Sequence, residues 1–415
     1  MQTVYIAIPA MDEKDTVFQT LHCIAQQQCE CPIKVFVCVN QPESWWEDEE
    51  KVLVCENNRK TMDLLQNNSV FPVEIIDCSS KGNAWKTKKA GVGQARKALT
   101  DKILSIASDD DIFISMDADT LFESDYCQTV ADNFRVHLSA VGMAVPYYHK
   151  KNHSETESRA MLRYELYMRN YNVHLLQIGS PYAYTALGSA ICCRVKACKA
   201  VGGFDTQTSG EDFYFLQKLC KYGKLLRYNS SKVYPATRFS SRVPFGTGTA
   251  VYNGISGDWH SYPIFHHSGF EIIRQLYRQI ERLFYEDFDH ELLRFLQTAF
   301  PEKNSWKPLR ENYKTLPLFT KAFHTKVDGL QIFRFLRHHR QQMQKTDEEC
   351  LSENIKAFRE NSSADPAICR FWKEKLLNHS FSFEKIPLEQ LDDLRDCFMR
   401  QESIYQQDFD RDLLK

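Results

Sequence analysis

Two acidic residues follow an apolar run in the segment IFISMDADT, residues 112–120. The apolar part is typical of a buried strand, and Asp117 and Asp119 come at its end. Two ionised carboxylates this close repel each other, and a divalent cation between them offsets the repulsion. The pair suits Mg²⁺ or Mn²⁺, because these hard ions take carboxylate oxygens and keep positions for phosphate oxygens. The alternative is a solvated turn, since Asp is common where strands end.

A second acidic pair, Glu211 and Asp212, opens a predicted helix in the segment GGFDTQTSGEDF, residues 202–213. A purely structural explanation exists for it, because acidic residues in a first helical turn complement the helix dipole. A basic residue, Arg96, lies in GVGQARKALTD, residues 91–101, ahead of the first acidic pair. Its guanidinium can hold oxygens bidentately, which makes Arg96 a candidate for binding a nucleotide or its phosphates.

The elements that must position these residues alternate between strands and helices up to about residue 245. Strands are predicted at VYIAIPA, IKVFVCVNQ, FPVEIIDCS, DIFISMDAD and AVGMAVPYY, and helices over residues 15–27 and 93–108. This alternation indicates an α/β fold with a mostly parallel sheet and helices on both faces, where ligands bind at the carboxyl ends of strands. IPAMDE, VNQPES and the Asp117 pair all lie at such ends.

The pattern changes after about residue 268, where apolar residues recur at helical spacing. They are Ile273, Leu276, Ile280, Leu283 and Phe284, continued by Phe288, Leu292 and Phe295. We therefore expect a helical C-terminal region over residues 251–415 after a sheet domain over residues 1–250.

Taken together, these motifs resemble the family-2 glycosyltransferases, which have the GT-A fold, a Rossmann-like nucleotide-diphospho-sugar transferase fold. The resemblance covers roughly residues 3–250. It rests on the Asp-x-Asp strand and on three further segments: Pro9 and Glu13 after the first strand, Ala95 and Arg96 at a helix start, and Gly202–Asp205 with Gly210–Asp212. The order and spacing of four weak motifs are more specific than any one of them.

The resemblance implies a metal-dependent transfer of a sugar from a nucleotide-diphosphate donor to an acceptor hydroxyl. Asp119 would hold Mn²⁺ or Mg²⁺, and Asp117 would bind the ribose or reach the metal. The metal would neutralise the charge that grows on the leaving diphosphate. Asp212 would take the proton of the acceptor hydroxyl, so the anomeric configuration would invert, and Glu211 would act beside it.

The donor-binding residues implied by the resemblance are Pro9, Glu13, Asn40, Arg96 and Asp117. Two positions depart from the family pattern. Asp12 stands where the family usually has Asn, and Asn40 stands where it usually has an Asp that reads uracil. An Asn side chain still offers a carbonyl acceptor to a ring N–H, so a UDP-sugar is favoured and a GDP-sugar is the alternative.

A few further residues have a second explanation that is at least as good. Asp77 ends the third predicted strand and is either part of base or ribose recognition or an ordinary strand-end Asp. The glycine-rich stretch Arg238–Thr249 is either a loop that closes over a diphosphate or a surface loop. A third metal ligand from His260, His266 or His267 competes with structural or exposed histidines.

Composition limits the partners and the compartment. The 415 residues include 52 Lys and Arg against 54 Asp and Glu, so no global field attracts nucleic acid or anionic lipid. No signal peptide and no apolar run long enough to cross a bilayer is visible, and we expect a cytoplasmic protein. Arg274, Arg278 and Arg282 recur every fourth residue, which allows at most peripheral membrane contact and is also typical of a solvated helix face.

Two other functions use a similar sheet. A sugar nucleotidyltransferase is disfavoured, because its glycine-rich N-terminal signature with Arg and Lys does not follow residue 8. A non-catalytic nucleotide-sugar-binding protein would keep the fold, but here both acidic motifs are intact. The acceptor stays open among a glycan, a lipid-linked sugar and a small molecule.

Overall fold

The structure is a computed structural model of the chain. It describes residues 2–86, 90–152, 154–207, 209–237, 247–299, 306–359, 366–371 and 381–412. The stretch Arg238–Thr249 lies almost wholly outside this part of the chain, so its expected role as a closing loop is not addressed.

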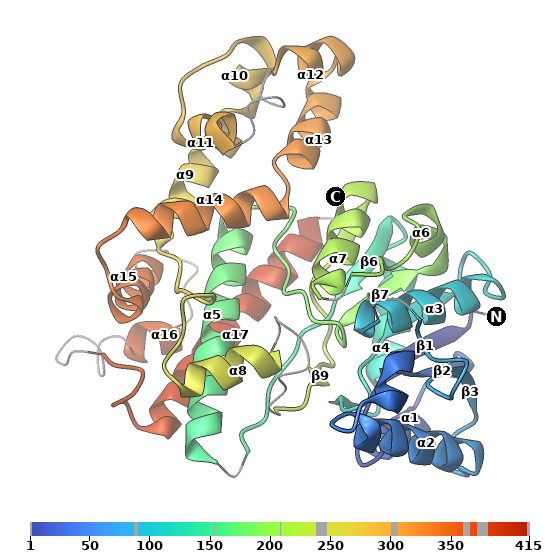
Figure 1. The fold of residues 1–415 in the computed structure, drawn as a ribbon. Coiled ribbons are helices and arrows are strands. Elements are labelled where there is room, and N and C mark those ends of the chain that lie inside the picture. The colour runs from blue at the N-terminus through green and yellow to red at the C-terminus, as the bar shows by residue number, and fades with distance from the viewer. Residues whose placement is uncertain are drawn as a thin grey trace. The chain divides into compact units, whose positions relative to one another are not determined.

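A seven-stranded sheet forms the centre of the N-terminal part (Figure 1). Its strand order is β3-β2-β1-β4-β7-β6-β8. β1 pairs in parallel with β2 and β4, β2 with β3, and β6 with β8, whereas β7 is antiparallel to both of its neighbours. The strands are β1 Val4–Ala10, β2 Ile33–Asn40, β3 Val73–Cys78, β4 Ile112–Ser115, β6 Ala140–Ala144, β7 Ile191–Arg194 and β8 Lys224–Leu226. The expected mostly parallel sheet is confirmed.

Helices pack on this sheet and keep its central strands out of water. All seven residues of β1 are buried, as in a parallel strand that is covered on both faces. The first helices are α1 Val17–Ala25, α2 Val52–Gln66, α3 Val92–Leu104, α4 Tyr126–Val136, α6 Val195–Ala200 and α7 Glu211–Tyr222, with the short 3₁₀ helix η1 Glu43–Glu47. α3 packs on β1 and β2, and α7 packs on β6 and β8. A separate two-stranded ladder joins β5 Leu121–Phe122 to β9 Val233–Tyr234.

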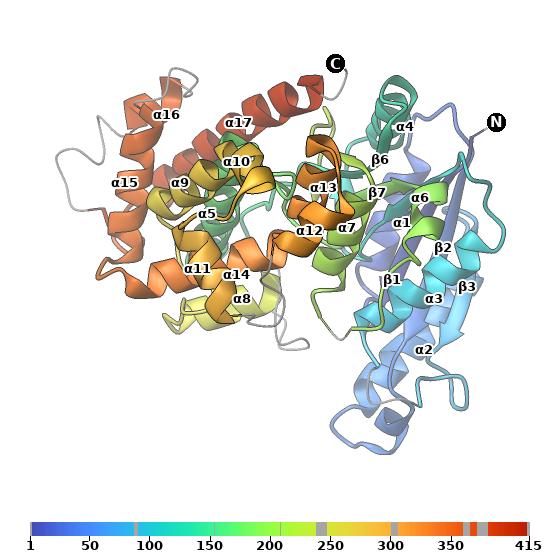
Figure 2. The ribbon, with the colours of Figure 1, turned by 90° about the horizontal axis from the view of Figure 1, so that it is seen from above.

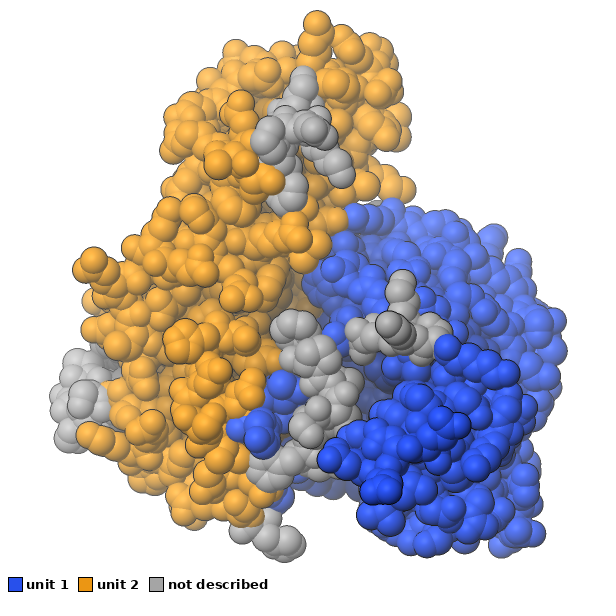
Figure 3. Space-filling model, in the orientation of Figure 1, with its two compact units in different colours: residues 1–152, 186–252, 410–415 blue, residues 153–185, 253–409 orange. Residues whose placement is uncertain are grey.

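The chain divides into two compact units (Figure 3). Unit 1 consists of residues 1–152, 186–252 and 410–415, and it contains the sheet. Unit 2 consists of residues 153–185 and 253–409. The domain boundary expected near residue 250 stays a prediction.

Unit 2 is built from helices, which confirms the helical C-terminal region. Its helices are α5 Glu155–Gln177, α9 His267–Arg278, α10 Ile280–Tyr285, α11 Glu291–Ala299, α12 Lys307–Asn312, α13 Leu316–Lys326, α14 Gly329–Gln342, α15 Asp347–Arg359, α16 Pro366–Phe371 and nearly all of α17 Leu388–Asp412; α8 Thr247–Ile255 crosses the unit boundary. α15 lies beside α16 in both ribbon views (Figures 1 and 2). Of the apolar residues expected to pack, four are fully buried: Ile273, Leu276, Leu283 and Leu292.

The arginine stripe expected on one helix falls on two. α9 ends at Arg278, Gln279 caps it, and α10 begins at the next residue and carries Arg282. Arg274 pairs with Glu271, so part of the stripe is neutralised within α9. No helix in the ranges that the structure covers is both long and apolar enough to span a membrane.

A buried cluster of charged side chains joins α5 to α17 inside unit 2. Arg169 Nη2 lies 2.6 Å from Glu165 Oε1, and Arg395 Nη1 lies 3.2 Å from the other oxygen of Glu165. Glu402 accepts hydrogen bonds from Arg169 and Asn172. Because each charge has an opposite partner, the cluster is compatible with burial.

Candidate active site

The predicted site residues of unit 1 gather at one edge of the sheet. β1 to β4 run parallel, so their carboxyl ends meet at the same edge. Asn40 is the last residue of β2, and Asp117 follows β4 by two residues. This edge is where doubly wound sheets bind their ligands.

Arg96 is the residue that joins the two acidic motifs. It lies in α3, is 3% exposed, and contacts the carboxylates of both motifs. Its Nη2 lies 2.5 Å from Asp117 Oδ1 and its Nε lies 3.1 Å from Glu211 Oε1, while Nη1 donates to Ser115 Oγ. Asp117 and Glu211 are more than ninety residues apart in the sequence. They nevertheless contact the same guanidinium, because its donors form a fork that can hold two carboxylates.

Gly188 provides the space that this guanidinium occupies. A Cβ atom added at Gly188 would lie 2.0 Å from Arg96 Nη2 and 2.7 Å from Arg96 Cζ. No side chain fits at that distance, so position 188 must be glycine if Arg96 is to keep its place. Neither Gly188 nor Ser115 was predicted from the sequence, because neither belongs to a local motif.

The second acidic motif is held by a sharp turn into α7. Gly210 precedes the helix with φ of 75°, in the left-handed region that side chains other than Gly rarely adopt. Behind the turn, Phe204 stacks on Phe215 with ring centroids 4.1 Å apart. The GGFD and GED stretches are thus parts of one packed corner that presents Glu211 and Asp212 at a helix start.

The two acids of this corner differ in their surroundings. Glu211 is 4% exposed and is held in its ion pair with Arg96. Asp212 is partly exposed, and its Oδ1 accepts a hydrogen bond from the Phe213 backbone N–H. Burial, followed by the charge of Glu211, raises the pKa of Asp212 to about 7, although Phe213 N–H and Arg96 act in the opposite direction.

Arg96 itself stays protonated in this cluster. Burial acts to lower its pKa, but the negative charges of Asp117, Glu211 and Asp212 outweigh burial, so the pKa lies above its ordinary value. One permanent cation among three carboxylates leaves the site with an excess of negative charge. Such an excess is what a bound divalent cation offsets.

The turn that carries Asp119 is fixed by the first helix. Thr20 of α1 donates its hydroxyl to the carbonyls of Ala118 and Thr120, at 3.0 and 3.1 Å. Asp117 and Asp119 remain partly exposed on this turn. Their carboxylate oxygens are suitable ligands for Mg²⁺ or Mn²⁺, and the turn is preorganised, so these residues fit a divalent cation.

Among the described residues, the aspartate pair forms no group of three ligand atoms within 4.8 Å of each other. Across the described ranges, only one group of three His, Cys, Asp or Glu side chains has all of its ligand atoms within 4.8 Å of each other. It consists of His266, His267 and Glu353. They belong to unit 2, and Lys345 also contacts Glu353. His260 is 98% exposed and bonds to Asp258. The expectation of a histidine ligand stays a prediction.

Asn40 ties the ends of β1 and β2 together. Its Nδ2 donates to the carbonyl of Ala10 at 3.2 Å. Asn58 of α2, which is fully buried, donates to the carbonyl of Asn40 and to Gln41 Oε1, and it accepts from Asp12 N–H at 2.8 Å. Asn58 therefore connects both loops that follow these strands, a role for which the sequence gives no local signal.

The backbone conformation at position 12 explains why Asp can replace the Asn of the family pattern there. Asp12 has φ of 63°. Within the described ranges it is the only residue other than glycine with a positive φ. Asn and Asp are the residues after glycine that tolerate this conformation best. An Asp in place of the usual Asn keeps the geometry of the turn.

The other predicted residues at this edge have structural partners. Pro9 pairs with Cys38 inside the sheet, and Glu13 is buried and accepts from the Thr16 hydroxyl at 2.6 Å. Asp77 accepts hydrogen bonds from the backbone of Ser79 and Ser80 and from Asn83. Burial acts to raise the pKa of Asp77, but these bonds outweigh it and lower the pKa to about 2. Asp77 is thus an ionised turn residue.

The family model of glycosyl transferase family group 2 matches residues 112–319, which is half of the chain. No curated protein sequence matches. Among solved structures, S. aureus TarS 1–349 in complex with UDP-GlcNAc is similar at 12% identity and a TM-score of 0.39, over 82% of this chain and 92% of that chain. GalNAc-T7 with UDP, GalNAc and Mn²⁺ is similar at 11% identity and a TM-score of 0.36, over 78% of this chain and 57% of that chain.

Proposed function

Because the chain belongs to glycosyl transferase family group 2, we propose that it moves a sugar from a nucleotide-diphosphate donor to an acceptor hydroxyl with the residues gathered around Arg96. Membership of this family makes the chain a glycosyltransferase. It also sets aside the two alternatives, a sugar nucleotidyltransferase and a non-catalytic binding protein. The GT-A resemblance and the mostly parallel sheet are confirmed.

One observation carries the assignment of the site. A single buried guanidinium contacts Asp117 after β4 and Glu211 at the start of α7, and Asp212 is the next residue. Capping of α7 would account for acids at a helix start, but it would not require the acids to share a cation with a strand-end aspartate. A shared site for donor and base accounts for this arrangement.

Asp119 and Asp117 are the proposed ligands of Mn²⁺ or Mg²⁺. The bound cation supplies electrostatic stabilisation to the leaving diphosphate. One carboxylate oxygen of Asp117 accepts a hydrogen bond from Arg96, which orients the carboxylate. Asp119 lies on the same turn, which Thr20 holds in place. In this scheme Arg96 acts by positioning, and its direct contact with the donor stays a prediction.

Asp212 is the proposed general base. Its carboxylate takes the proton of the acceptor hydroxyl while that oxygen attacks the anomeric carbon, and the bond from this carbon to the diphosphate oxygen breaks. Attack from the face opposite the leaving group inverts the anomeric configuration. A pKa raised to about 7 suits a base that works near neutral pH. Glu211, held by Arg96, is a positioning residue.

The donor is proposed to be a UDP-sugar, with a GDP-sugar as the alternative. Asn40 is the last residue of β2 at the binding edge, and an amide oxygen can accept a hydrogen bond from a pyrimidine ring N–H. Pro9 and Glu13 are proposed to shape the neighbouring loop. The acceptor, whether glycan, lipid-linked sugar or small molecule, is not assigned.

The metal assignment can be tested by calorimetry without knowledge of the acceptor. UDP is titrated into the protein with and without Mn²⁺. The Asp119→Ala variant should lose the metal-dependent part of UDP binding and keep the thermal midpoint of the wild type, because removal of one of two crowded carboxylates relieves repulsion. Asp125→Ala, an exposed control six residues later, should bind like the wild type. Metal-dependent binding by Asp119→Ala at wild-type affinity would overturn the proposed site.

A further inference from the structure

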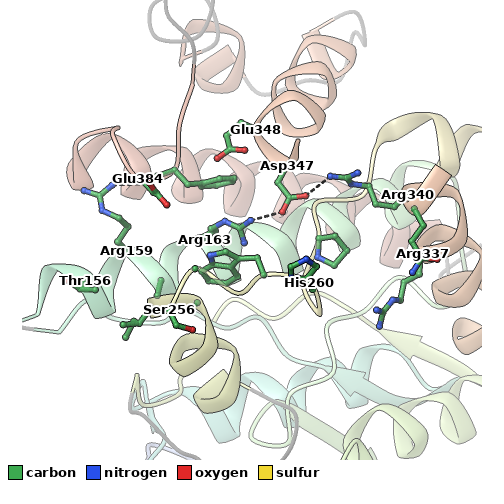
Figure 4. Close-up of a pocket in the computed structure, with 18 residues that line it drawn as sticks. Thr156, Arg159, Arg163, Ser256, His260, Arg337, Arg340, Asp347, Glu348 and Glu384 are labelled. Atoms are coloured by element: carbon green, nitrogen blue, oxygen red, sulfur yellow. Dashed lines mark hydrogen bonds and ion pairs between the residues drawn. The ribbon is translucent and has the colours of Figure 1, made fainter. Parts of the chain in front are cut away.

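Unit 2 contains a pocket of about 870 Å³ whose lining includes none of the proposed donor, metal or base residues (Figure 4). All of its lining residues belong to unit 2. One wall is a face of α5, from Thr156 to Arg163, and the opposite wall comes from the end of α14 and the start of α15. Segments 254–263 and 383–384 complete it. The volume is in the range of small-molecule sites.

Arginines from two helices line this pocket. They are Arg159 and Arg163 of α5 and Arg337 and Arg340 of α14. Arg163 is 8% exposed, and its guanidinium lies over the rings of Trp259 at 3.9 Å and Phe383 at 4.7 Å. Such stacking fixes the guanidinium plane and leaves its edge to make hydrogen bonds.

The carboxylate at the centre of the pocket is shared. Figure 4 shows Arg163 and Arg340 both directed at Asp347, and their nitrogens lie 2.6 and 2.9 Å from its two oxygens. Asp347 also accepts a hydrogen bond from the backbone N–H of Ile264. Two cations and an N–H thus meet one carboxylate, and Glu348 and Glu384 act on Arg163 only from beyond ion-pair distance.

Two observations show that the positive charge of the pocket arginines is not fully compensated. Among the described residues, the buried Nη1 of Arg163 has no hydrogen-bond partner, and burial lowers the pKa of Arg163 to about 10 in spite of the negative charges of Asp347, Glu348 and Glu384. Arg337 is half-buried and pairs with no carboxylate in the part of the chain that is described. A buried cationic donor without a partner is costly, and an anionic ligand would satisfy it.

The pocket also offers groups that an inorganic anion alone would not need. Glu348, Glu384, Gln341 and Ser256 line it together with the arginines. Carboxylates repel an anion, but they accept hydrogen bonds from hydroxyl groups, and Gln and Ser both donate and accept. A ligand with many hydroxyls and one negative group matches both the arginines and the other polar side chains of this lining.

We propose that the pocket binds a saccharide that carries an anionic group, a phosphate or a carboxylate. The anionic group lies against Arg163 and Arg337, and hydroxyls of the sugar lie against Glu348 and Gln341. This inference goes beyond the proposed transfer and does not depend on it, because none of the lining residues is a donor-site residue.

The test is calorimetric titration of the full chain with glucose 6-phosphate, glucuronate, glucose and inorganic phosphate. We expect glucose 6-phosphate or glucuronate to bind, with glucose and phosphate each at least tenfold weaker. Arg337→Gln should weaken the sugar acid or sugar phosphate about tenfold, the effect of one lost charge-assisted hydrogen bond. Glu348→Gln should weaken the sugar ligand and leave the weak phosphate binding unchanged or stronger.

The control is Arg334→Gln, an exposed arginine of the same helix that does not line the pocket. It should bind all four probes like the wild type, and thermal midpoints confirm that each variant is folded. The proposal is overturned if neither anionic sugar binds, if Arg337→Gln binds them as tightly as Arg334→Gln does, or if inorganic phosphate binds as tightly as glucose 6-phosphate.

Discussion

At the scale of single residues, Arg96 determines how the two acidic motifs act together. It gives Asp117 and Glu211 fixed orientations, and it is itself held by Ser115 and by the space at Gly188. A buried arginine with this many partners is a positioning group, since its geometry depends on all of them at once. The neighbouring Asp212 is partly exposed, whereas Glu211 is buried in its ion pair with Arg96.

Gly188→Ala tests this dependence with one methyl group. The new Cβ would meet the guanidinium at 2.0 Å, so Arg96 must shift and the acids must shift with it. We expect donor turnover to fall about 10²-fold, which is the effect of a misplacement near 1 Å in an active site. Donor hydrolysis in the presence of Mn²⁺ measures the change.

A double variant shows whether the effect passes through Arg96. If Gly188→Ala acts only by moving the guanidinium, adding it to Arg96→Gln should cause little further loss of turnover, because the two effects are then not additive. Losses that multiply in the double variant would mean that Gly188 acts elsewhere.

At the scale of elements, α2 controls the loops after β1 and β2 through Asn58. Asn58→Ala leaves Asp12 N–H and Gln41 Oε1 without these buried partners. We expect the donor KM to rise about tenfold while kcat stays within about twofold, because the loops are proposed to bind the donor and not to touch the bond that breaks. Steady-state hydrolysis of a UDP-sugar gives both constants.

Asn58→Asp serves as the matched comparison. It keeps an acceptor for Asp12 N–H but turns a carboxylate oxygen towards the carbonyl of Asn40 and Gln41 Oε1, so its KM should rise at least as much as that of Asn58→Ala. A fall in kcat at constant KM in either variant would place Asn58 in the chemical step and contradict a role in donor binding.

The elements also show what the sequence can predict. β1 was predicted with its observed bounds, because a short apolar run that contains β-branched residues is typical of a buried strand. The 23-residue helix α5 was not predicted, since Arg163, Glu165 and Arg169 hide its periodicity. Their partners include residues of α17, more than two hundred positions away, and no local pattern reveals that these charges are buried.

The residues of the site also divide into those that the sequence predicts and those that it does not. Asp117, Asp212 and Arg96 belong to short motifs whose residue types suggest their chemistry before any fold is known. Gly188 and Asn58 have no such motif, because their roles arise only from contacts across the folded unit. Positioning residues of this kind become visible only in three dimensions.

At the scale of the whole molecule, unit 2 depends on charges in its core. Arg395 is fully buried and pairs with Glu165, Asp392 and Asp396. Arg395→Leu leaves Glu165 with less compensation, so we expect a loss of about 3–5 kcal/mol in the free energy of unfolding. Urea unfolding followed by far-ultraviolet circular dichroism measures this loss.

Arg294→Leu is the matched surface control for the same substitution. Arg294 pairs with Asp289, and both side chains are exposed, so the loss should stay below about 1 kcal/mol. Equal stability of Arg395→Leu and the wild type would show that the buried cluster contributes nothing net to unit 2.

The central claim is that glycosyl transfer depends on the carboxylate of Asp212 as base. The measurement is the pH profile of donor turnover for the wild type, Asp212→Asn and Glu211→Gln, with donor binding determined in parallel. Since the base must be ionised and its pKa is raised to about 7, wild-type turnover should fall as the pH drops below about 7.

Asp212→Asn should bind the donor normally, turn it over about 10²- to 10⁴-fold more slowly, and show no acidic limb in its residual activity. Glu211→Gln should be affected less in the chemical step, because Glu211 is held in its ion pair with Arg96. Near-wild-type turnover by Asp212→Asn, together with an inactive Glu211→Gln, would contradict the account and move the base to Glu211.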